Sequence, residues 1–588
     1  MNEANAEQRV IRQLIEALLF ESICSYNYRA GHFYFTLAGF QYRVNGKISG
    51  FSRIRLNAHA MQFFTEETWQ PIVLSTLLKH LPVSLQVKQK LTTELNQTIK
   101  LCQWNDKNLT RPSSRRTLPY SQLESALDEG HPYHPCFKAR TGFNENDHQT
   151  YGPESANLFQ LHWLAVRRCN LKRRFNSVPE HIFWQQELGD AVYQQLQKIL
   201  VKQTDDCSAF SLMPIHPWQW DNLKENLVTA MTKKELYYLG AAGDFYQASI
   251  SVRTLLNISN PEKANIKLPL NVVNTSSLRT IESHSICTAP ILSQWLNELK
   301  KSDPYLQKNM ILLSEYAGIR IVNDGVKTLP WIDILDGHFG VIFRESLTQY
   351  CAEDTVVPYV ALTVIEQDNK PFIDPWIKQH GCESWLKQLI KQTVIPVWHL
   401  LVHHGIAVEA HGQNMLLQHR DGWPEKVILR DFHESLEYVH DYLAKPNLAP
   451  IFGELEDCYN TAKPNQYYWM SGVEGLRELF VDTLFVFNLA DLSVLLEEHY
   501  QFEEQYFWQL IYQCFEHYQD SGITAKKRIV QLDIFQSSIQ TESLLKKKLT
   551  SDELSEFHHS VDNPIAAAQK SLQRPFSNEQ SVVEKIIC

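Results

Sequence analysis

Several common functional signatures are missing from this 588-residue chain. It has no CxxC pair, and no two of its 11 cysteines lie within four residues of each other, so a zinc knuckle, a thioredoxin site and a disulfide framework lack support. It has no glycine-rich GxGxxG loop, no Walker A motif, no internal repeat and no low-complexity tract. The composition is ordinary, 44% hydrophobic and 21% charged, and predicts a globular protein of two to four domains.

The chain also lacks an excess of positive charge. Its formal net charge is -10, which argues against a dedicated nucleic-acid binder. The most apolar long segment, Leu479 to Leu496, carries Asp482 and Asp491, and such charges are costly at the centre of a bilayer. We expect a buried helix there. The N-terminus is acidic and polar before its first apolar stretch, unlike a signal peptide, so we expect a cytoplasmic protein with no membrane partner.

The spacing of apolar residues predicts an α+β protein with three regions. Helical spacing from about Glu7 to Leu101 predicts a mainly helical N-terminal part. Alternation with period two over Asp244–Leu256 and Asn265–Val273 predicts a strand-rich middle. Helical patterns dominate again after about residue 383, interrupted by one hairpin at Asn414–Phe432.

Histidines and cations gather in the segment GHPYHPCFKARTGF, Gly130–Phe143. Pro132 and Pro135 prevent a regular helix, so the segment is expected to form a shaped loop. Lys138 and Arg140 suit an anionic phosphate. A rigid surface turn with solvated charges would explain the same residues.

A second group of cations lies on the predicted middle strands. Ser249, Ser251 and Arg253 would share one face of a strand by the period of two, and Lys267 would lie on the next strand. The following segment, NTSSLRT, predicts a short helix.

In that helix, Asn274, Thr275 or Ser276 would be the cap, with Arg279 one turn inside. A helix N-terminus beside three cations would bind an anion. The alternative is an outward sheet face with ordinary charges, which the small number of acids between these cations disfavours.

The predicted hairpin turns at Asp421–Gly422, with His411 and Asn414 before its first strand and Asp431 after its second. The hairpin would bring Asn414 near Asp431, and amide and carboxylate oxygens are ligands for Mg²⁺ held on a nucleotide. Protein kinases use this layout. The alternative for Asp431 is a salt bridge to Arg430 or a helix cap.

A small-molecule kinase is therefore one candidate function. An aminoglycoside-type kinase places its catalytic aspartate directly after a His-Gly pair, and Gln413 stands at that position here. A carboxylate that attacks the α-phosphorus of ATP is already an anion and needs no such base. The hairpin thus fits an enzyme that forms an acyl-adenylate and pyrophosphate, and the kinase remains the alternative.

Taken together, these segments resemble the IucA/IucC family, the siderophore synthetases that act independently of non-ribosomal peptide synthetases. The matching segments, in family order, are HPYHPCFKARTGF within Gly130–Phe143, SVRTL with Arg253, KLPLNVVNTSSLRTI from Lys267, HGQNMLL from His411 and RDF at Arg430–Phe432. They span more than half of the chain. The resemblance implies a cupped-hand fold with a mainly helical thumb (1–145), strand-rich fingers (146–345) and a mainly helical palm (346–588) that carries the kinase-like hairpin, commonly as a homodimer.

The resemblance also implies a reaction. ATP would activate a carboxylate, citrate or a citryl derivative, and an amine or hydroxyl would attack the adenylate, with release of AMP and pyrophosphate. The implied ATP contacts are Lys138, Ser251, Arg253, Lys267, Ser276, Arg279 and Gln413, with Mg²⁺ on Asn414 and Asp431. The implied catalytic residues are His411, Arg279 and Lys267, and the carboxylate contacts are Thr275, Arg279, His411, Lys546 and Lys548.

One segment departs from the family pattern. Near its C-terminus the family usually has a Lys followed by a run like Leu-Leu-Arg-Met-Arg-Leu, which helps to hold the carboxylate. Here the run reads TESLLKKKL, Thr541–Leu549, with Glu542 in place of that Lys and with Lys546 and Lys548 at the Arg places. We expect the cationic pocket to be retained. A solvated helix face is the alternative.

A third hypothesis is a non-catalytic binder or an iron-siderophore reductase, because the C-terminal region of the family can resemble reductase-type proteins. Such reductases hold an iron–sulfur cluster on closely spaced C-terminal cysteines. Cys458, Cys514 and Cys588 are too scattered for a cluster, so we expect a colourless protein.

Overall fold

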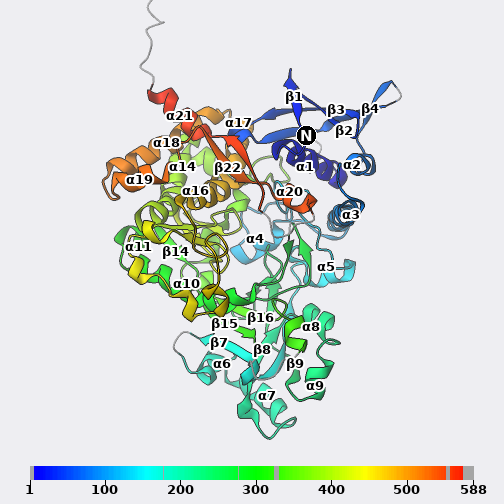
Figure 1. Cartoon of the computed structure of the whole chain (residues 1–588), viewed down its shortest axis with the longest axis vertical. Coiled ribbons are helices and arrows are strands. Elements are labelled where there is room, and N and C mark those ends of the chain that lie inside the picture. The colour runs from blue at the N-terminus through cyan, green and yellow to red at the C-terminus, as the bar shows by residue number, and fades with distance from the viewer. Residues whose placement is uncertain are drawn as a thin grey trace, which may run out of the picture.

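The computed structural model describes residues 5–573 apart from 66, 176–177, 276, 323–329 and 551–555. Ser276 and Cys588 lie outside the described residues. The protein is a mixture of helices and strands, as predicted. Figure 1 shows a large sheet at one end of the molecule and, at the other, an N-terminal unit beside the helical C-terminal part. These last two parts share one hydrophobic core, and the large sheet has a second core of its own.

The N-terminal unit is an antiparallel sheet packed on helix α1 (Ala6–Phe20), which begins at a capping box of Asn5 and Gln8. The sheet has the order β1-β2-β3-β4-β5. Its strands are β1 (Tyr26–Arg29), β2 (His32–Leu37), β3 (Phe40–Ile48), β4 (Ile54–Thr65) and β5 (Thr68–Pro71), and the helices that follow are α2 (Leu74–His80), α3 (Leu85–Asn108), α4 (Tyr120–Ala126) and α5 (Glu145–Tyr151).

The prediction of a mainly helical N-terminal part was wrong for residues 26–71. Phe33, Phe35 and Leu37 alternate with more exposed residues along β2 and are buried against α1 and its neighbours. Two tight turns, Ala30-Gly31 and Ala38-Gly39, have positive φ at both residues and reverse the chain between strands. The helical spacing in the predicted range belongs to α1, α2 and α3, which lie before and after the sheet in the sequence.

The middle of the chain forms an antiparallel sheet of order β7-β15-β16-β11-β10-β9-β6-β8. Its strands are β6 (Phe159–Arg167), β7 (Leu171–Phe175), β8 (Phe210–Ile215), β9 (Leu236–Ala248), β10 (Thr254–Asn257), β11 (Asn265–Lys267), β15 (Glu315–Ile321) and β16 (Gly340–Arg344). Its helices are α6 (Glu180–Leu188), α7 (Asp190–Val201), α8 (Pro217–Leu223), α9 (Val228–Thr232), α10 (Ser283–Lys301) and α12 (Pro330–Ile334). Helix α10 packs on β15, where a Cβ at Gly318 would lie 2.1 Å from the Ile286 carbonyl oxygen.

The predicted strand over Asp244–Leu256 is in fact two strands joined by a turn. Strand β9 ends at Ala248, β10 begins at Thr254, and the two pair antiparallel. Val252 has a φ of 70° in the turn, and the Ser251 hydroxyl accepts the Thr254 N–H at 3.1 Å. Serine hydroxyls that bond nearby backbone groups favour such turns, which the alternation of apolar residues does not reveal.

The predicted helix over residues 274–279 was also wrong. Strands β12 (Val273–Asn274) and β13 (Ser277–Leu278) pair as a small hairpin instead. Thr275 has a left-handed φ of 59°, which no helix contains, and the N–H of Arg279 bonds to the Val272 carbonyl at 2.9 Å. The next helix, α10, begins only at Ser283.

The C-terminal part confirms the predicted hairpin and its turn. Strands β19 (Met415–Arg420) and β20 (Trp423–Leu429) pair beside β14 (Met310–Leu312) and β17 (Val356–Pro358) in one sheet. Two-stranded ladders join β18 (Ile406–Val408) to β21 (Leu436–Tyr438) and β22 (Ser538–Glu542) to β23 (His558–Asp562). The helices are α11 (Pro304–Asn309), α13 (Asp374–His380), α14 (Cys382–Leu389), α15 (Ile395–His399), α16 (Val473–Val481), α17 (Ala490–Tyr500), α18 (Glu504–Asp520), α19 (Lys526–Leu532), α20 (Leu544–Leu549) and α21 (Pro564–Gln573).

The apolar segment predicted as a buried helix lies in the core. It belongs to the continuous helix Val473–Tyr500, whose most apolar stretch is 83% buried inside the protein. Length and composition alone would allow this helix to cross a membrane, but its burial identifies it as a core helix.

A buried carboxylate joins three distant segments of the chain. Glu21, at the end of α1, is 1% exposed and accepts a hydrogen bond from the Tyr133 hydroxyl at 2.6 Å. It also accepts the N–H groups of Leu545 (2.8 Å) and Lys546 (2.6 Å), in the first turn of α20. Glu21 therefore ties α1 to the loop of residues 130–143 and to α20, which lies beside the N-terminal unit in Figure 1.

Burial raises the pKa of Glu21 to about 7, although its three donors oppose the shift. The folded protein thus keeps this proton to a higher pH than the unfolded chain does. We expect the free energy of unfolding of the wild type, minus that of Glu21→Gln, to fall by roughly 3 kcal/mol as pH rises from about 4.5 to about 7.

Urea unfolding midpoints across this pH range measure the difference. Glu498→Gln, at a largely exposed position, is the control and should give a difference that does not change with pH. A pH-independent difference for Glu21→Gln would contradict the assignment of this proton to Glu21.

Candidate active site

Asp431 lies in a buried group of cations where the hairpin meets the large sheet. It follows β20, and its Oδ1 lies 3.3 Å from the Lys267 Nζ of β11 and 2.9 Å from the Arg344 Nη1 of β16. Burial opposes ionisation of Asp431, but the charges of Lys267 and Arg344 hold its pKa well below the usual range. Burial is also the main cause of the lowered pKa of Lys267. The group therefore joins two buried cations and one shared carboxylate at the seam between two parts of the fold.

Two further side chains offer ligand atoms beside this carboxylate. Glu315, Asp431 and His433 each offer one such atom, and the three atoms lie within 4.8 Å of one another. The Glu315 Oε1 lies 2.6 Å from the His433 Nδ1. The two carboxylates suit Mg²⁺, which prefers oxygen ligands.

The other predicted magnesium ligand, Asn414, directly precedes the first strand of the same hairpin. Its carbonyl oxygen accepts the Arg430 N–H at 3.1 Å, so the backbones before β19 and after β20 are adjacent. The Asn414 amide donates to the Glu409 carbonyl oxygen at 3.2 Å and lies 3.4 Å from the Glu409 Oε2. The hairpin thus brings the backbone of the two predicted ligands together, with their side chains bonded to other groups.

Arg253 enters the same region from the turn after β9. It donates to the Thr280 carbonyl oxygen, and its Nη2 lies 3.8 Å from the Glu434 Oε2. Burial opposes ionisation of Glu434, but the charges of His433, Arg253 and Lys267 lower its pKa to about 2. Predicted ATP contacts Arg253 and Lys267 are therefore neighbours around one carboxylate.

His131 and His134, in the loop of residues 130–143, are locked by the backbone. The His131 Nδ1 accepts the N–H groups of Tyr133 and His134, both at 3.1 Å, and the His134 Nδ1 accepts the Cys136 N–H at 3.1 Å. A ring nitrogen that accepts cannot carry the proton, so each neutral ring holds its proton on Nε2. Burial, reinforced by the charge of His411, lowers the pKa of His131 to about 3, and burial with the charge of Lys548 holds the pKa of His134 well below its usual range.

His411 repeats this arrangement from the other side of the site. Its Nδ1 accepts the N–H groups of Gln413 and Asn414, both at 3.2 Å, and its Nε2 lies 3.5 Å from the Glu409 Oε1. The charge of His411 reaches His131. Three imidazoles from two distant segments therefore carry their N–H on Nε2, and the Nε2 of His411 faces Glu409.

Arg279 is a half-buried cation with one unmet donor. Burial, with the charges of Arg253 and Arg140, lowers its pKa to about 9. Its Nε is buried without a hydrogen-bond partner, and its Nη2 lies 3.5 Å from the Thr275 Oγ1. A guanidinium held in this way favours a bound anion, which would supply the missing acceptor.

The two lysines predicted to hold the carboxylate point to different places. The Lys548 Nζ donates to the Thr275 carbonyl oxygen at 3.0 Å and pairs with the buried Glu94. The Lys546 Nζ instead lies 5.7 Å from the centre of the Phe557 ring. The structure thus brings Lys548 together with Thr275, whereas Lys546 lies over Phe557.

Lys138, predicted to close over ATP, is 1% exposed and already paired. Its Nζ donates to the Glu154 Oε1 at 2.6 Å and to the Asp128 carbonyl oxygen at 2.7 Å. Arg140 also binds Glu154, at 2.7 and 2.9 Å. The shaped loop is confirmed, because no helix forms over residues 130–143, but its two cations neutralise one buried acid.

Two other predicted ATP contacts act on the backbone in this structure. Ser251 bonds to Ser249 (Oγ–Oγ 3.2 Å) and holds the turn that carries Arg253. The Gln413 carbonyl oxygen accepts the Arg430 Nε at 2.9 Å, and Arg430 is buried against Glu124. Both residues therefore position the chain next to predicted site residues.

The sequence analysis missed several partners of the predicted residues, above all Arg344, Glu154 and Glu315. A signal existed for Arg344, because an arginine that ends the apolar strand GVIFR must have a buried counter-charge. Glu154 and Glu315 carry no local signal, since their partners come from packing between distant segments.

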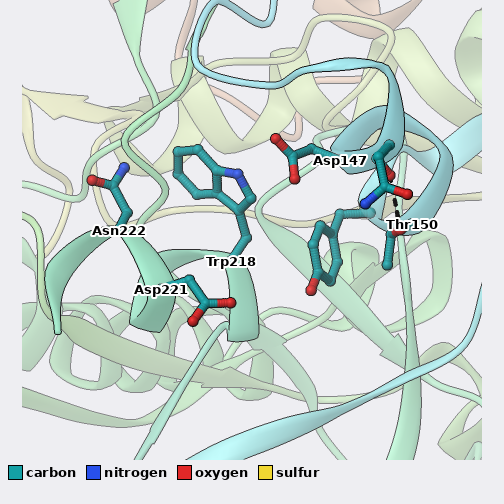
Figure 2. Close-up of a pocket in the computed structure, with 7 residues that line it drawn as sticks. Asp147, Thr150, Trp218, Asp221 and Asn222 are labelled. Carbon is teal, nitrogen blue, oxygen red and sulfur yellow. Dashed lines mark hydrogen bonds between the residues drawn. The ribbon is translucent and has the colours of Figure 1, made fainter.

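Two open hollows lie next to this region and contain none of the predicted site residues. Figure 2 shows the first, about 400 Å³, which is lined by Asn146, Asp147, Thr150, Tyr151, Trp218, Asp221 and Asn222. Trp218 contacts Phe143 (ring centres 5.1 Å apart), so this hollow lies behind the loop of residues 130–143. The second, about 490 Å³, includes Lys172, Arg320 and Glu456 in its lining.

Comparison with known proteins identifies the family. The IucA / IucC family matches residues 119–364, and a family described as ferric iron reductase FhuF-like transporter matches residues 383–554. A citryl-spermidine/3,4-dihydroxybenzoyl-citryl-spermidine:spermidine ligase from Bacillus anthracis is 32% identical over 587 residues, 96% of this chain and 94% of that protein. The chain belongs to the IucA/IucC family.

Other relatives agree with this membership. An aerobactin synthase from Escherichia coli is 28% identical and covers 75% of this chain and 78% of its own. The structure of the petrobactin biosynthesis protein AsbB from Bacillus anthracis str. Sterne matches with a TM-score of 0.89 at 31% identity, over 96% of both chains. An ATP-bound aerobactin synthetase IucA from Klebsiella pneumoniae, 17% identical, shares the fold with a TM-score of 0.74 over 95% and 99% of the two chains.

These findings confirm the IucA/IucC prediction and its class of reaction. This IucA/IucC protein is a siderophore synthetase, an ATP-dependent ligase that joins carboxylates derived from citrate to amines. The FhuF-like match covers the C-terminal region for which a reductase was the alternative. Full-length ligase relatives span that region as well.

The charges around Asp431 generate a test of the site's architecture. Asp431→Asn would leave Lys267 and Arg344 buried without their shared counter-charge, which should destabilise the fold by about 3–5 kcal/mol and reduce activity. Asp368→Asn breaks an exposed pair with Arg116 and should leave the urea unfolding midpoint nearly unchanged. Equal midpoints for the two variants would contradict a buried, shared counter-charge.

Proposed function

We propose that this synthetase forms the adenylate of citrate or a citryl derivative and transfers the acyl group to a cationic amine, with release of AMP and pyrophosphate. The observation that carries this proposal is Arg279, a half-buried guanidinium whose Nε is buried without a hydrogen-bond partner. It lies among neutral imidazoles that present Nε2 donors, with Lys548 nearby. A site of this kind recognises a polycarboxylate by charge and by directed hydrogen bonds.

The residues around Asp431 fit the phosphates of ATP. The Nε and Nη2 of Arg344 are buried without partners, which favours a polyanion beside the cations Lys267 and Arg253. Asp431 and Asn414 would hold Mg²⁺, with Glu315 as a further oxygen donor. Bound Mg-ATP supplies the electrophilic α-phosphorus.

Within this proposal the side chains have separate tasks. Lys267 and Arg253 neutralise phosphate oxygens. Besides burial, the charge of Arg253 lowers the pKa of Arg279, so the two cations are close, and Arg279 would lie between the phosphate and carboxylate groups. His411 donates from Nε2 and, with Thr275 and Lys548, orients the carboxylate. Fixed donors of this type stabilise charge that develops in the transition state.

The remaining contacts predicted from the family stay proposals. Lys138 would serve ATP after exchange of Glu154 for a phosphate. Ser251 and Gln413 would contact ATP from the turns that they hold, Ser276 would also contact ATP, and Lys546 would contact the carboxylate substrate.

An acidic strip next to His411 supports a cationic amine as the acceptor. Glu437 of β21 lies opposite Ala407 of β18. The same pairing continues one step beyond β18, because the Glu409 N–H donates to the Ser435 carbonyl oxygen. Glu409 is two residues from Ala407, so Glu409 and Glu437 lie on the same face of this two-stranded ladder. Burial, with the charges of Glu556, Glu478 and Glu409, raises the pKa of Glu437 to about 8. An ammonium group would relieve this repulsion, and the Bacillus anthracis relative is named for the polyamine spermidine.

The family resemblance supports three further proposals: a thumb (1–145), fingers (146–345) and palm (346–588), a homodimer, and a cytoplasmic location. The core shared by the N-terminal unit and the C-terminal helices supports one rigid frame for thumb and palm. Light scattering of the purified chain measures the dimer.

Arg279→Ala and His411→Ala test the carboxylate site. Each should lower citrate-dependent acyl product, trapped with hydroxylamine, by at least about a hundredfold, because a buried charge partner or a directed donor to the substrate is lost. Arg111→Ala, at an exposed arginine, is the matched control and should retain full activity.

The same reactions identify the nucleotide product. AMP supports the synthetase, whereas ADP would favour the small-molecule kinase. Full turnover by Arg279→Ala would refute the assignment of the site.

Glu437→Gln tests the amine site separately. We expect the KM for a polyamine acceptor to rise by roughly tenfold, since one carboxylate of the strip is lost. Citrate-dependent exchange of pyrophosphate into ATP, which needs no amine, should be unchanged. Glu454→Gln, on an exposed turn, is the control. An unchanged KM for every polyamine tested would rule out the strip as the acceptor site.

A further inference from the structure

Three histidines and an aspartate meet in the helical C-terminal part, and none of them belongs to the candidate active site. Asp303, His399, His403 and His404 each offer one ligand atom, and these four atoms lie within 4.8 Å of one another. Asp303, His399 and His404 are at most 7% exposed, whereas His403 is only half-buried. The cluster therefore has a dry interior and one side towards solvent.

The backbone has an unusual form at this place. His399 ends α15, and His403 and His404 end the π-helical turn Leu400–His404. In an α-helix with 3.6 residues per turn, residues five apart point to different sides, but a π turn brings them together. The His399 and His403 rings stack with centres 4.7 Å apart, and the His403 and His404 centres are 4.8 Å apart. The wider turn thus gathers all three rings on one side.

The carboxylate comes from another helix and is held in place. Asp303 caps α11, where its Oδ1 accepts the N–H groups of Tyr305 (2.8 Å) and Leu306 (3.2 Å). Its Oδ2 lies 2.7 Å from the Nε2 of both His399 and His404. One carboxylate oxygen thus faces two imidazoles at once.

The Nδ1 atoms of His399 and His403 have partners that would orient these two rings. The His399 Nδ1 lies 2.6 Å from the Tyr518 hydroxyl, and the His403 Nδ1 lies 3.0 Å from the Thr524 Oγ1. Histidines that bind metals usually donate their second N–H to such an oxygen. The His404 Nδ1 is buried without a hydrogen-bond partner, so of the three rings only His399 and His403 have such an oxygen.

We propose that Asp303, His399, His403 and His404 form a structural site for Zn²⁺ or a similar divalent transition-metal ion. Three imidazoles and one carboxylate make a complete tetrahedral donor set, which leaves no open position for catalysis. Mg²⁺ prefers oxygen ligands and keeps its waters, so this site and the proposed Mg-ATP site select different ions.

Only a small rearrangement is needed. Ligand atoms around tetrahedral Zn²⁺ lie about 3.3 Å apart, so the contacts of Asp303 with His399 and His404 would open by roughly 0.6 Å. The half-buried side of His403 gives the ion a path to the site.

The bound ion would brace the support of the candidate active site. It would fasten α11 to the π turn, through Tyr518 to the last turn of α18, and through Thr524 to the segment that follows α18. Gly405 (φ 88°) follows directly and leads into β18, the strand that precedes His411. The proposed role is therefore stability of this frame.

Metal binding is measured on the full-length protein after treatment with a chelator. We expect the stripped protein to take up about one Zn²⁺ per chain that survives desalting, and Zn²⁺ but not Mg²⁺ to raise its thermal unfolding midpoint. Co²⁺ in place of Zn²⁺ should give the visible absorption of a tetrahedral site. Neither readout depends on enzymatic activity, so the result is independent of the proposed reaction.

Variants assign the ion to these residues. His403→Gln, at the half-buried position, and Asp303→Asn, which keeps an amide oxygen for the cap of α11, should each lose the Co²⁺ spectrum and the Zn²⁺-dependent stabilisation. His162→Gln, at a half-buried histidine on the large sheet, is the control and should keep both. Failure of the folded wild type to bind Zn²⁺ or Co²⁺, or equal binding by His403→Gln and the wild type, would overturn the proposal and leave a hydrogen-bond network only.

Discussion

The shared ion pairs of Asp431 hold the candidate active site together. Lys267 and Arg344 come from neighbouring strands of the large sheet, and Asp431 comes from the end of the C-terminal hairpin. Burying two cations at this seam without an acid would cost too much folding free energy, and burying the acid without the cations would cost as much. Each side of the site therefore requires the other, and the fold positions the cations proposed to bind phosphate by the same interaction that joins its parts.

Around that centre the protein keeps cations charged and imidazoles neutral. Arg279 has a guanidinium nitrogen without a partner, while His131 and His134 are deprived of their charge by burial. Neutral rings with Nδ1 fixed by backbone N–H groups add directed donors without adding charge repulsion. The combination attracts an anion strongly and still orients it, which a cluster of cations alone would not do.

The sequence predicted those parts of the site that depend on local chemistry. The hairpin with its Asp421–Gly422 turn, and the positions of Asn414 and Asp431 at its ends, follow from turn residues and alternation. The turn at Ser251 and the hairpin around Thr275 were mistaken for a strand and a helix, because hydroxyl-to-backbone bonds and a left-handed residue leave no trace in apolar spacing.

Contacts between segments far apart in the sequence could not be predicted from local sequence patterns. Glu94 pairs with Lys548, and Glu21 accepts from the backbone of α20, across more than four hundred residues of chain in each case.

These two contacts also explain how the run TESLLKKKL can depart from the family pattern and still reach the site. Glu21 fixes the start of α20 through its backbone, so the position of Lys548 depends on helix geometry rather than on the identity of the residues before it. Glu542, in place of the family lysine, therefore alters the charge near the acidic strip of Glu409 and Glu437. It does not move Lys548, which donates to Thr275.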